Sequence, residues 1–288
     1  MIPDSLKDHI VEQTGQSITS SRRVSGGSIN QAALIELEDT GRCFLKWNTA
    51  TEADLFAKEV RGLALLRSAE TDLIVPRVIE QATYNGDKGY LLLEYIEEGS
   101  GSPASSKAFG RELAALHKTR HTRYGLDHNN YIGKLPQSNY WHDEWIDFFI
   151  QERMEPQVSM AVDAGKLSGS VHSSFQRMYQ RLPGIFPDEP PSLLHGDLWG
   201  GNYFFNSDGK AAIYDPAVYY GNREMEISFT KMFGGFSPEF YRAYNDVWPL
   251  SPDFNSRKDI YNLYPLLVHA NLFGGHYARQ VVSVVRQF

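Results

Sequence analysis

The spacing of apolar residues changes from a helical period to a strand-like one within the first fifty residues. Residues 3–14 carry apolar side chains three or four positions apart, which predicts a short helix that Gly15 ends. From residue 17 to residue 47 the apolar residues form strand-like runs, and the turn-forming residues 39–41 separate two of these runs. The pattern therefore predicts a helix followed by a β-hairpin.

The following segment returns to the helical period and then leaves it again. Residues 51–68 place Leu and Val side chains on one helical face behind Thr51, which begins a capping signal. Residues 73–84 and 89–96 are strand-like, and the Asn-Gly-Asp sequence at 85–87 is typical of a hairpin turn. One longer helix and a second hairpin are therefore expected here.

A linker-like segment divides the chain into two unequal parts. Residues 97–106, EEGSGSPASS, are rich in Gly and Ser, so we place a boundary between a strand-rich lobe, 1–96, and a larger, mainly helical lobe, 97–288. Helices of the second lobe are predicted over residues 103–118, 141–154 and 166–182, and in several stretches after Met225. The expected fold class is α+β with two lobes, and a cleft between them is the natural place for a ligand.

Composition limits the partners of the protein. The 288 residues are 42% hydrophobic and 22% charged, and the net charge of -7 argues against a broad basic face for nucleic acid or anionic lipid. The charged N-terminal stretch is unlike a signal peptide, and no run approaches the roughly 18 apolar residues of a membrane span. Cys43 is the single cysteine and cannot form an internal disulfide. We expect a cytoplasmic protein with small partners, with no nucleic acid or membrane among them and a monomer as the favoured state.

Residues 192–217, SLLHGDLWGGNYFFNSDGKAAIYDPA, interrupt the helical lobe with short strand-like runs that end in polar residues. If the runs around Leu194 and Ile213 lie side by side, then Asp197, Asn202 and Asp215 converge at one end. Carboxylate and amide oxygens that face one point suit Mg²⁺, which also recruits phosphate groups of a substrate. Phosphoryl transfer needs such a grouping, because one carboxylate orients the attacking hydroxyl while the other groups hold the metal.

The segment HGDLWGGN followed by IYDP resembles the catalytic loop and the metal-binding aspartate of protein-kinase-like small-molecule kinases. Residues 199–201, Trp-Gly-Gly, narrow the resemblance to the fructosamine (ketosamine) kinase family, within the group that includes the aminoglycoside phosphotransferases. Residues 124–139, 141–154 and 219–236 are also similar to this family, so the resemblance extends from Lys46 to at least Phe236. It implies a bilobal protein-kinase-like fold with ATP and Mg²⁺ as cofactors.

The resemblance implies roles for five residues of the larger lobe. Asp197 would accept or orient the proton of the acceptor hydroxyl, while Asn202 and Asp215 would bind Mg²⁺. His195 would keep the catalytic loop in shape, which is a structural role. Glu226 is similar to a carboxylate that braces this loop in aminoglycoside-kinase-like proteins.

In the smaller lobe the resemblance implies a phosphate-binding lysine and its partner. Lys46 would bind the α- and β-phosphates, and Glu59 would pair with it; Glu52 is the competing candidate. A lone strand lysine is usually a solvated edge residue, and Glu59 could instead pair with a surface cation, so each role depends on the resemblance. Gly26 and Gly27 are placed to offer backbone N–H groups to phosphate, although the GxGxxG spacing of protein kinases is missing.

The remaining site residues concern the adenine and the acceptor. Glu94, Tyr95 and Ile96 resemble the hinge whose backbone pairs with an adenine edge. Trp199, in the catalytic loop, and Phe233 are candidates for acceptor binding, and a packed core position is the alternative for each.

The resemblance implies an ATP- and Mg²⁺-dependent kinase that phosphorylates the 3-hydroxyl of a ketosamine, such as a fructosamine or a ribulosamine, in deglycation. The acceptor is a free or a protein-linked ketosamine. The alternatives are a kinase for an aminoglycoside, choline or homoserine, a nucleotide-binding scaffold without activity, and a metal hydrolase that uses His195 and Asp197 as ligands. Pro216 follows Asp215 where protein kinases have Asp-Phe-Gly, and no long activation segment comes after it. Regulation by phosphorylation of that loop is therefore not expected.

Overall fold

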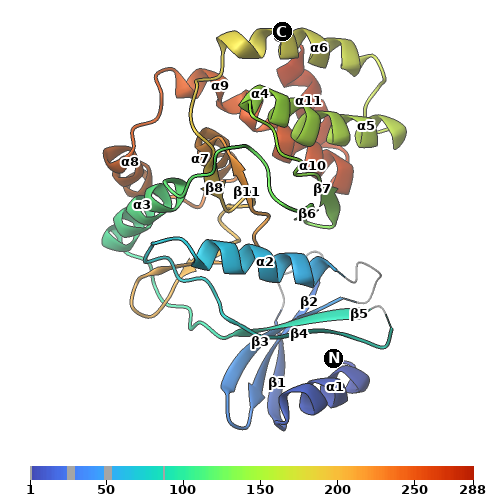
Figure 1. Ribbon diagram of the computed structural model, residues 1–288, viewed down its shortest axis with the longest axis vertical. Helices are drawn as coiled ribbons and strands as arrows, with labels where there is room; N and C mark the ends of the chain where they lie inside the picture. Colours follow the sequence, from blue (N-terminus) through green and yellow to red (C-terminus); the bar gives the residue numbers. More distant parts are fainter. Residues whose placement is uncertain (1, 25–29, 49–53, 87) are drawn as a thin grey trace.

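The computed structural model describes residues 2–24, 30–48, 54–86 and 88–288. It has a mixed α+β fold, with an antiparallel sheet near the N-terminus and helices that dominate the rest of the chain (Figure 1). Helix α1 (Asp4–Thr14) covers one face of the sheet through Leu6 and Ile10. It ends at Gly15, whose φ of 68° favours glycine, as the sequence predicted.

The sheet has five strands in the order β1-β2-β3-β5-β4, all antiparallel. The strands are β1 (Ile18–Val24), β2 (Gln31–Leu37), β3 (Gly41–Trp47), β4 (Val78–Tyr84) and β5 (Lys88–Glu94). Both predicted hairpins are confirmed, and Asn85 and Gly86 have the positive φ values of a tight hairpin turn. The strand predicted from residue 73 begins only at Val78. Pro76 cannot donate to a ladder, and Ile74 instead bridges Ala212 in the other lobe.

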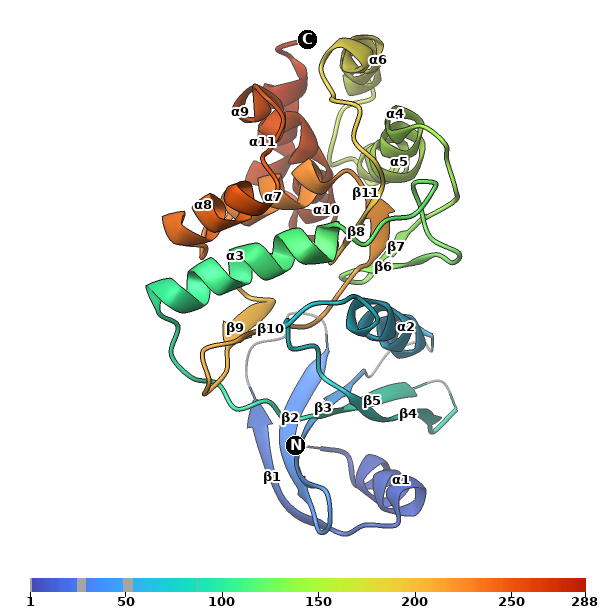
Figure 2. The ribbon, with the colours of Figure 1, turned by 60° about the vertical axis from the view of Figure 1, so that its left-hand side comes forward.

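Helix α2 (Leu55–Arg67) lies between the sheet and the helical lobe (Figures 1 and 2). It begins at Leu55, directly after Asp54, and the predicted capping residue Thr51 lies outside the described residues. A Cβ added at Gly62 would lie 3.2 Å from Cγ of Pro216 in the segment after Asp215. The helix that carries Glu59 therefore packs directly on the segment that carries Asp215.

The helical lobe packs around a large apolar core. Its helices are α3 (Pro103–His117), α4 (Trp145–Phe148), a π-helix (Phe149–Met154), α5 (Glu155–Asp163), α6 (Val171–Arg181), a 3₁₀ turn (Leu182–Gly184), α7 (Arg223–Met232), α8 (Pro238–Val247), α9 (Phe254–Tyr261), α10 (Leu263–Phe273) and α11 (His276–Val285). In the described part of the chain, no helix combines the length and the hydropathy that crossing a membrane requires.

Two helix boundaries differ from the sequence prediction. The helix predicted over 141–154 begins at Trp145 and continues through a π-helix into α5. Pro156 has no N–H for the carbonyl of Glu152, and Nη1 of Arg153 donates to that carbonyl at 3.1 Å instead. The helix predicted from 166 begins at Val171, because the N–H of residue 166 turns back to close α5.

Three two-stranded sheets complete the helical lobe: β6 (Asn130–Ile132) with β7 (Leu135–Gln137), β8 (Ser192–Leu194) with β11 (Tyr219–Gly221), and β9 (Tyr203–Phe205) with β10 (Ala211–Ile213). The expected side-by-side arrangement of Leu194 and Ile213 is therefore wrong. Asp215 adopts a φ of 57°, and the chain turns there so that β11, and not β10, pairs with β8.

Candidate active site

A cleft of about 650 Å³ separates the sheet from the helical lobe. Lys46 on β3 and Glu59 on α2 line it from one side. Asp197, Asn202 and Asp215 line it from the other side. These five residues, which are distant along the chain, thus meet at one cavity.

Lys46 joins the two sides of the cleft. Its Nζ lies 2.7 Å from Oε1 of Glu59 and 2.7 Å from Oδ1 of Asp215. The side chain is 7% exposed, so Lys46 is not a solvated edge residue. Burial opposes its charge, but the carboxylates of Asp215 and Glu59 outweigh burial and raise the pKa of the ammonium, which stays protonated.

Glu59 makes no pair with a surface cation in the described residues, because the neighbouring cations have other partners. Arg61 pairs with Asp127 at 2.8 Å, and Lys58 lies near Asp54. Glu52, the competing candidate for the partner of Lys46, lies outside the described residues.

The loop between β8 and β9 holds Asp197 and Asn202 together. Nδ2 of Asn202 donates to the backbone carbonyl of Asp197 at 2.8 Å and to its Oδ2 at 3.0 Å. Burial raises the pKa of Asp197 well above its usual range, and the nearby carboxylate of Asp215 adds to this increase. The hydrogen bond from Asn202 acts in the opposite direction.

The donor set near Asp215 suits a hard divalent cation. Because Asn202 uses its Nδ2 on Asp197, its Oδ1 is free to act as a ligand, and the Asp215 side chain is 42% exposed to the cleft. Oxygen ligands of this kind, completed by water and phosphate, are those that Mg²⁺ prefers. His195 does not join them, since its Nε2 faces the carbonyl of Tyr214 at 3.0 Å and its Nδ1 faces the N–H of Asp197 at 3.3 Å.

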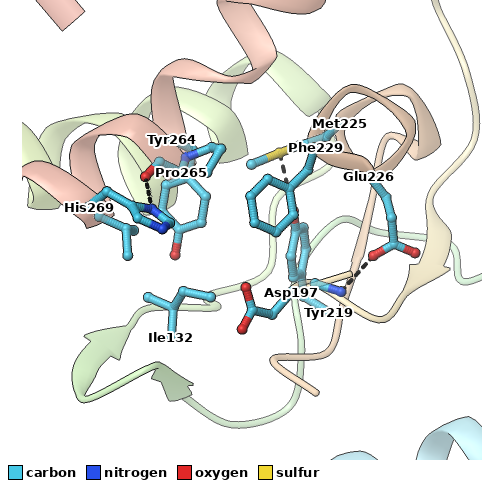
Figure 3. Close-up of a pocket in the computed structure, with 11 residues that line it drawn as sticks. Ile132, Asp197, Tyr219, Met225, Glu226, Phe229, Tyr264, Pro265 and His269 are labelled. Atoms are coloured by element: carbon cyan, nitrogen blue, oxygen red, sulfur yellow. Dashed lines mark hydrogen bonds between the residues drawn. The ribbon is translucent and has the colours of Figure 1, made fainter. Parts of the chain in front are cut away.

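Glu226 on α7 accepts hydrogen bonds from the backbone of the loop between β8 and β9, which is the predicted catalytic loop. The N–H of Gly196 donates to its Oε1 at 2.7 Å, the contact that a dashed line marks at Glu226 in Figure 3. The N–H of His195 donates to its Oε2 at 3.2 Å. Nε2 of His117, on α3, lies 2.8 Å from the same Oε2, and Nδ1 of His117 lies 2.8 Å from the hydroxyl of Tyr244. Burial alone would raise the pKa of Glu226, but the hydrogen bond and charge of His117, with smaller contributions from His195 and the N–H of Gly196, together lower it.

A second, smaller cavity of about 30 Å³ lies on the other side of Asp197. The Asp197 carboxylate points into it, opposite Ile132 and between Tyr264, His269 and Phe229 (Figure 3). Sequence analysis missed these four wall residues. They come from β6, α7 and α10, and each resembles an ordinary core position, so the sequence carries no signal that joins them.

The other predicted site residues have distinct surroundings. Glu94, Tyr95 and Ile96 line the large cleft where β5 ends. Trp199 lines the same cleft and is 40% exposed. Phe233 lines neither of the two cavities, but its ring lies 6.3 Å from that of Trp199. Gly26 and Gly27 lie outside the described residues.

Comparisons with known proteins agree on one family. The family model described as "Fructosamine kinase" matches residues 3–288. A Lactiplantibacillus plantarum protein named as a probable ketoamine kinase is 39% identical over 92% of this chain and 92% of its own length. A chloroplastic protein-ribulosamine 3-kinase of Oryza sativa subsp. indica is 33% identical over 97% of this chain and 81% of its own length.

Solved structures have the same fold. The crystal structure of a Thermobifida fusca protein, provisionally named as a fructosamine-3-kinase, matches with a TM-score of 0.88 and 29% identity. The match covers 99% of this chain and 98% of that one. The aminoglycoside phosphotransferase APH(4)-Ia matches with a TM-score of 0.64 at 16% identity over 98% of both chains, which shows a shared fold. The expected kinase-like α+β fold is thereby confirmed.

Proposed function

The chain belongs to the fructosamine kinase family, and we propose that it transfers the γ-phosphoryl group of ATP to the 3-hydroxyl of a ketosamine. The observation that carries this proposal is the contact of Lys46 with both Glu59 and Asp215 in a cleft that Asp197 and Asn202 also line. The relatives named ketoamine kinase and ribulosamine 3-kinase support the choice of acceptor. The phosphorylated sugar would then take part in deglycation.

In the proposed reaction, residues 1–96 bind the nucleotide. Lys46 binds the α- and β-phosphates through its ammonium group, which its two carboxylate neighbours keep protonated. Glu59 fixes the direction of this ammonium. The backbone at 94–96 receives the adenine. Gly26 and Gly27 offer N–H groups to the phosphates.

Residues 97–288 would supply the catalytic groups and bind the acceptor. Asn202 and Asp215 would hold Mg²⁺, which would supply positive charge to neutralise the triphosphate. Asp197 accepts a hydrogen bond from the acceptor hydroxyl and so directs its oxygen in line with the γ-phosphorus. As the new O–P bond forms, the bond from the γ-phosphorus to ADP breaks, ADP leaves, and Asp197 takes the hydroxyl proton. Glu226 fixes the loop that carries Asp197, and His195 ties this loop to the carbonyl of Tyr214.

The acceptor hydroxyl would approach Asp197 from the small cavity, because the nucleotide occupies the large cleft. Trp199 lines the large cleft beside Asp197 and would pack on the acceptor from there, with Phe233 next to it. We expect this reaction in the cytoplasm, because ATP is available there and its reducing conditions suit a single cysteine. Either a free ketosamine or a protein-linked one has the reacting sugar, and a monomer contains every group that the proposed reaction needs.

The decisive assay measures ATP consumption with a fructosyl-amine and with a ribulosyl-amine, each with and without Mg²⁺. Turnover that requires both a ketosamine and Mg²⁺ is the expected result. An aminoglycoside, choline and homoserine serve as competing acceptors. Faster turnover of one of these, or turnover with zinc in place of Mg²⁺, would contradict the proposal.

A further inference from the structure

A group of exposed aromatic side chains lies beside the candidate active site. Trp199 is 40%, Phe233 41% and Phe273 60% exposed. In the described residues only Val11 and Tyr140 are other large hydrophobic side chains with comparable exposure, so three of five gather in one place. Large exposed apolar residues that cluster mark binding surfaces more often than isolated ones do.

The rings form a continuous surface that crosses four segments of the helical lobe. Phe233 at the end of α7 lies 6.3 Å from Trp199 of the catalytic loop and 4.9 Å from His269 on α10. His269 in turn lies 5.7 Å from Phe273 and 5.0 Å from Tyr277 on α11, measured between ring centroids. We call these five residues the aromatic surface.

The aromatic surface is continuous with the place where the acceptor hydroxyl would react. Trp199 is two residues from Asp197, and His269 is one of the walls of the small cavity into which the Asp197 carboxylate points (Figure 3). That cavity of about 30 Å³ has room for about two water molecules. A ketosamine is larger than this, so most of it must lie outside the cavity, over the residues at its mouth.

Two helices end at the aromatic surface with the same sequence, Phe-Gly-Gly. Helix α7 is followed by Phe233 and the glycines 234–235, and α10 ends at Phe273 before the glycines 274–275. All four glycines have positive φ, between 64° and 94°, a conformation that glycine adopts readily. Helix C-termini carry partial negative charge and aromatic faces attract cations, so this surface favours a ligand that is both apolar and cationic.

We propose that the aromatic surface binds the amine part of the acceptor, namely the alkylammonium chain of a lysine residue that bears the sugar. The inference rests on the proposed function and deepens it by assigning a site to the amine. The sugar lies at Asp197, and its protonated secondary amine points towards Phe233 and Phe273. The lysine methylenes then pack on the rings, and the polypeptide stays outside.

The test compares two acceptors that share the same sugar. One is fructosyl-methylamine, which ends at the amine, and the other is a short peptide with fructose on the Nε of a lysine. Phe273→Ser removes the most exposed ring of the aromatic surface without touching a proposed catalytic group. We expect kcat/KM to fall ~10-fold for the peptide acceptor, as for loss of one well-placed apolar anchor, and to stay unchanged for the methylamine acceptor.

Tyr140→Ser is the matched control, because Tyr140 is 67% exposed and makes none of these ring contacts. It should leave kcat/KM unchanged for both acceptors. An equal fall for both acceptors in Phe273→Ser, or no fall for either, would overturn the inference and leave the proposed function intact. A wild-type protein that phosphorylates neither acceptor would contradict both the inference and the proposed function.

Sedimentation velocity tests whether a second copy of the chain, rather than the amine part of the acceptor, covers the aromatic surface. The same mass for wild type and Phe273→Ser at assay concentration is the expected result. A wild-type dimer that becomes a monomer on Phe273→Ser would show that the surface is a subunit interface, and the inference would be wrong.

Discussion

Lys46 shows how a buried charge depends on its neighbours. A buried ammonium is costly unless it is paired, and here two carboxylates from different parts of the chain pair with it. Glu59 is as buried as Lys46, whereas Asp215 remains open to the cleft. A nucleotide can therefore replace part of the contact with Asp215 while the contact with Glu59 persists.

Replacing Asp197 by Asn should abolish turnover and preserve nucleotide binding. The amide cannot accept the hydroxyl proton, and loss of such a group lowers kcat by about 10²–10⁴-fold. Calorimetric titration with Mg-ADP should give a dissociation constant close to that of the wild type. Activity near the wild-type level in Asp197→Asn would show that another group has this role.

Replacing Glu226 by Gln should lower kcat through the catalytic loop. The Gln side chain offers one acceptor where Glu226 receives hydrogen bonds from His195, Gly196 and His117, so the loop should shift. Misplacing a catalytic group by about 1 Å can cost ~10²-fold in rate. We expect a fall of this size in kcat, with little change in the KM for ATP.

Glu224→Gln is the matched control on the same helix. Glu224 is also buried, but its carboxylate pairs with Arg257 at 2.6 and 2.7 Å and makes no hydrogen bond to the loop among the described residues. Both variants should lower the thermal midpoint, since each breaks a buried polar contact. Equal losses of kcat in the two variants would indicate a general loss of stability rather than an effect on the loop.

The elements that could be predicted are those whose own pattern determines them. The β2–β3 and β4–β5 hairpins have clear turn residues between apolar runs, and α1 and α3 have clear ends. The pairing of β8 with β11 could not be predicted in this way. Each strand has three residues, which is too short for a pattern, and the pairing depends on the backbone turn at Asp215.

The candidate site also has one part that could be predicted from the sequence and one part that could not. The residues that line the large cleft carry a motif, so their grouping could be predicted although the assumed strand pairing was wrong. Tyr264 and His269 belong to a helix with eight buried residues among its eleven, and nothing local distinguishes the two that face Asp197. Only tertiary packing brings them to the cavity.

The close approach of two glycine pairs provides a test at the level of elements. A Cβ on Gly235, in the α7–α8 connection, would lie 2.9 Å from Cα of Gly200 in the catalytic loop. Gly235→Ala should therefore displace the loop and lower kcat at least ~10-fold, in addition to backbone strain of ~1 kcal/mol.

Gly234→Ala is the control for that strain. Gly234 also has a positive φ, of 73°, but a Cβ there would meet no atom within 4 Å. This variant should lose a similar ~1 kcal/mol of stability in a denaturant titration and keep its kcat. If both variants kept full activity, the contact between the two glycine pairs would have no role in positioning Asp197.

At the scale of the whole molecule, the cleft should couple nucleotide binding to stability. A ligand at 100 times its dissociation constant stabilises the folded state by about 2.7 kcal/mol. Mg-ADP should therefore raise the thermal midpoint of the wild type more than ADP with a chelator does. In Asp215→Asn this difference should largely disappear, because the proposed metal loses a charged ligand. An equal shift with and without Mg²⁺ in the wild type would contradict the assignment of the metal.

The segment after Asp215 determines how such an enzyme could be controlled. Residues 216–218 alone lead from Asp215 to β11, and they pack against α2 at Gly62 and against Gly196, where a Cβ would lie 2.0 Å from the carbonyl oxygen of Ala217. This connection is too short to act as an activation segment whose phosphorylation would open or close the cleft.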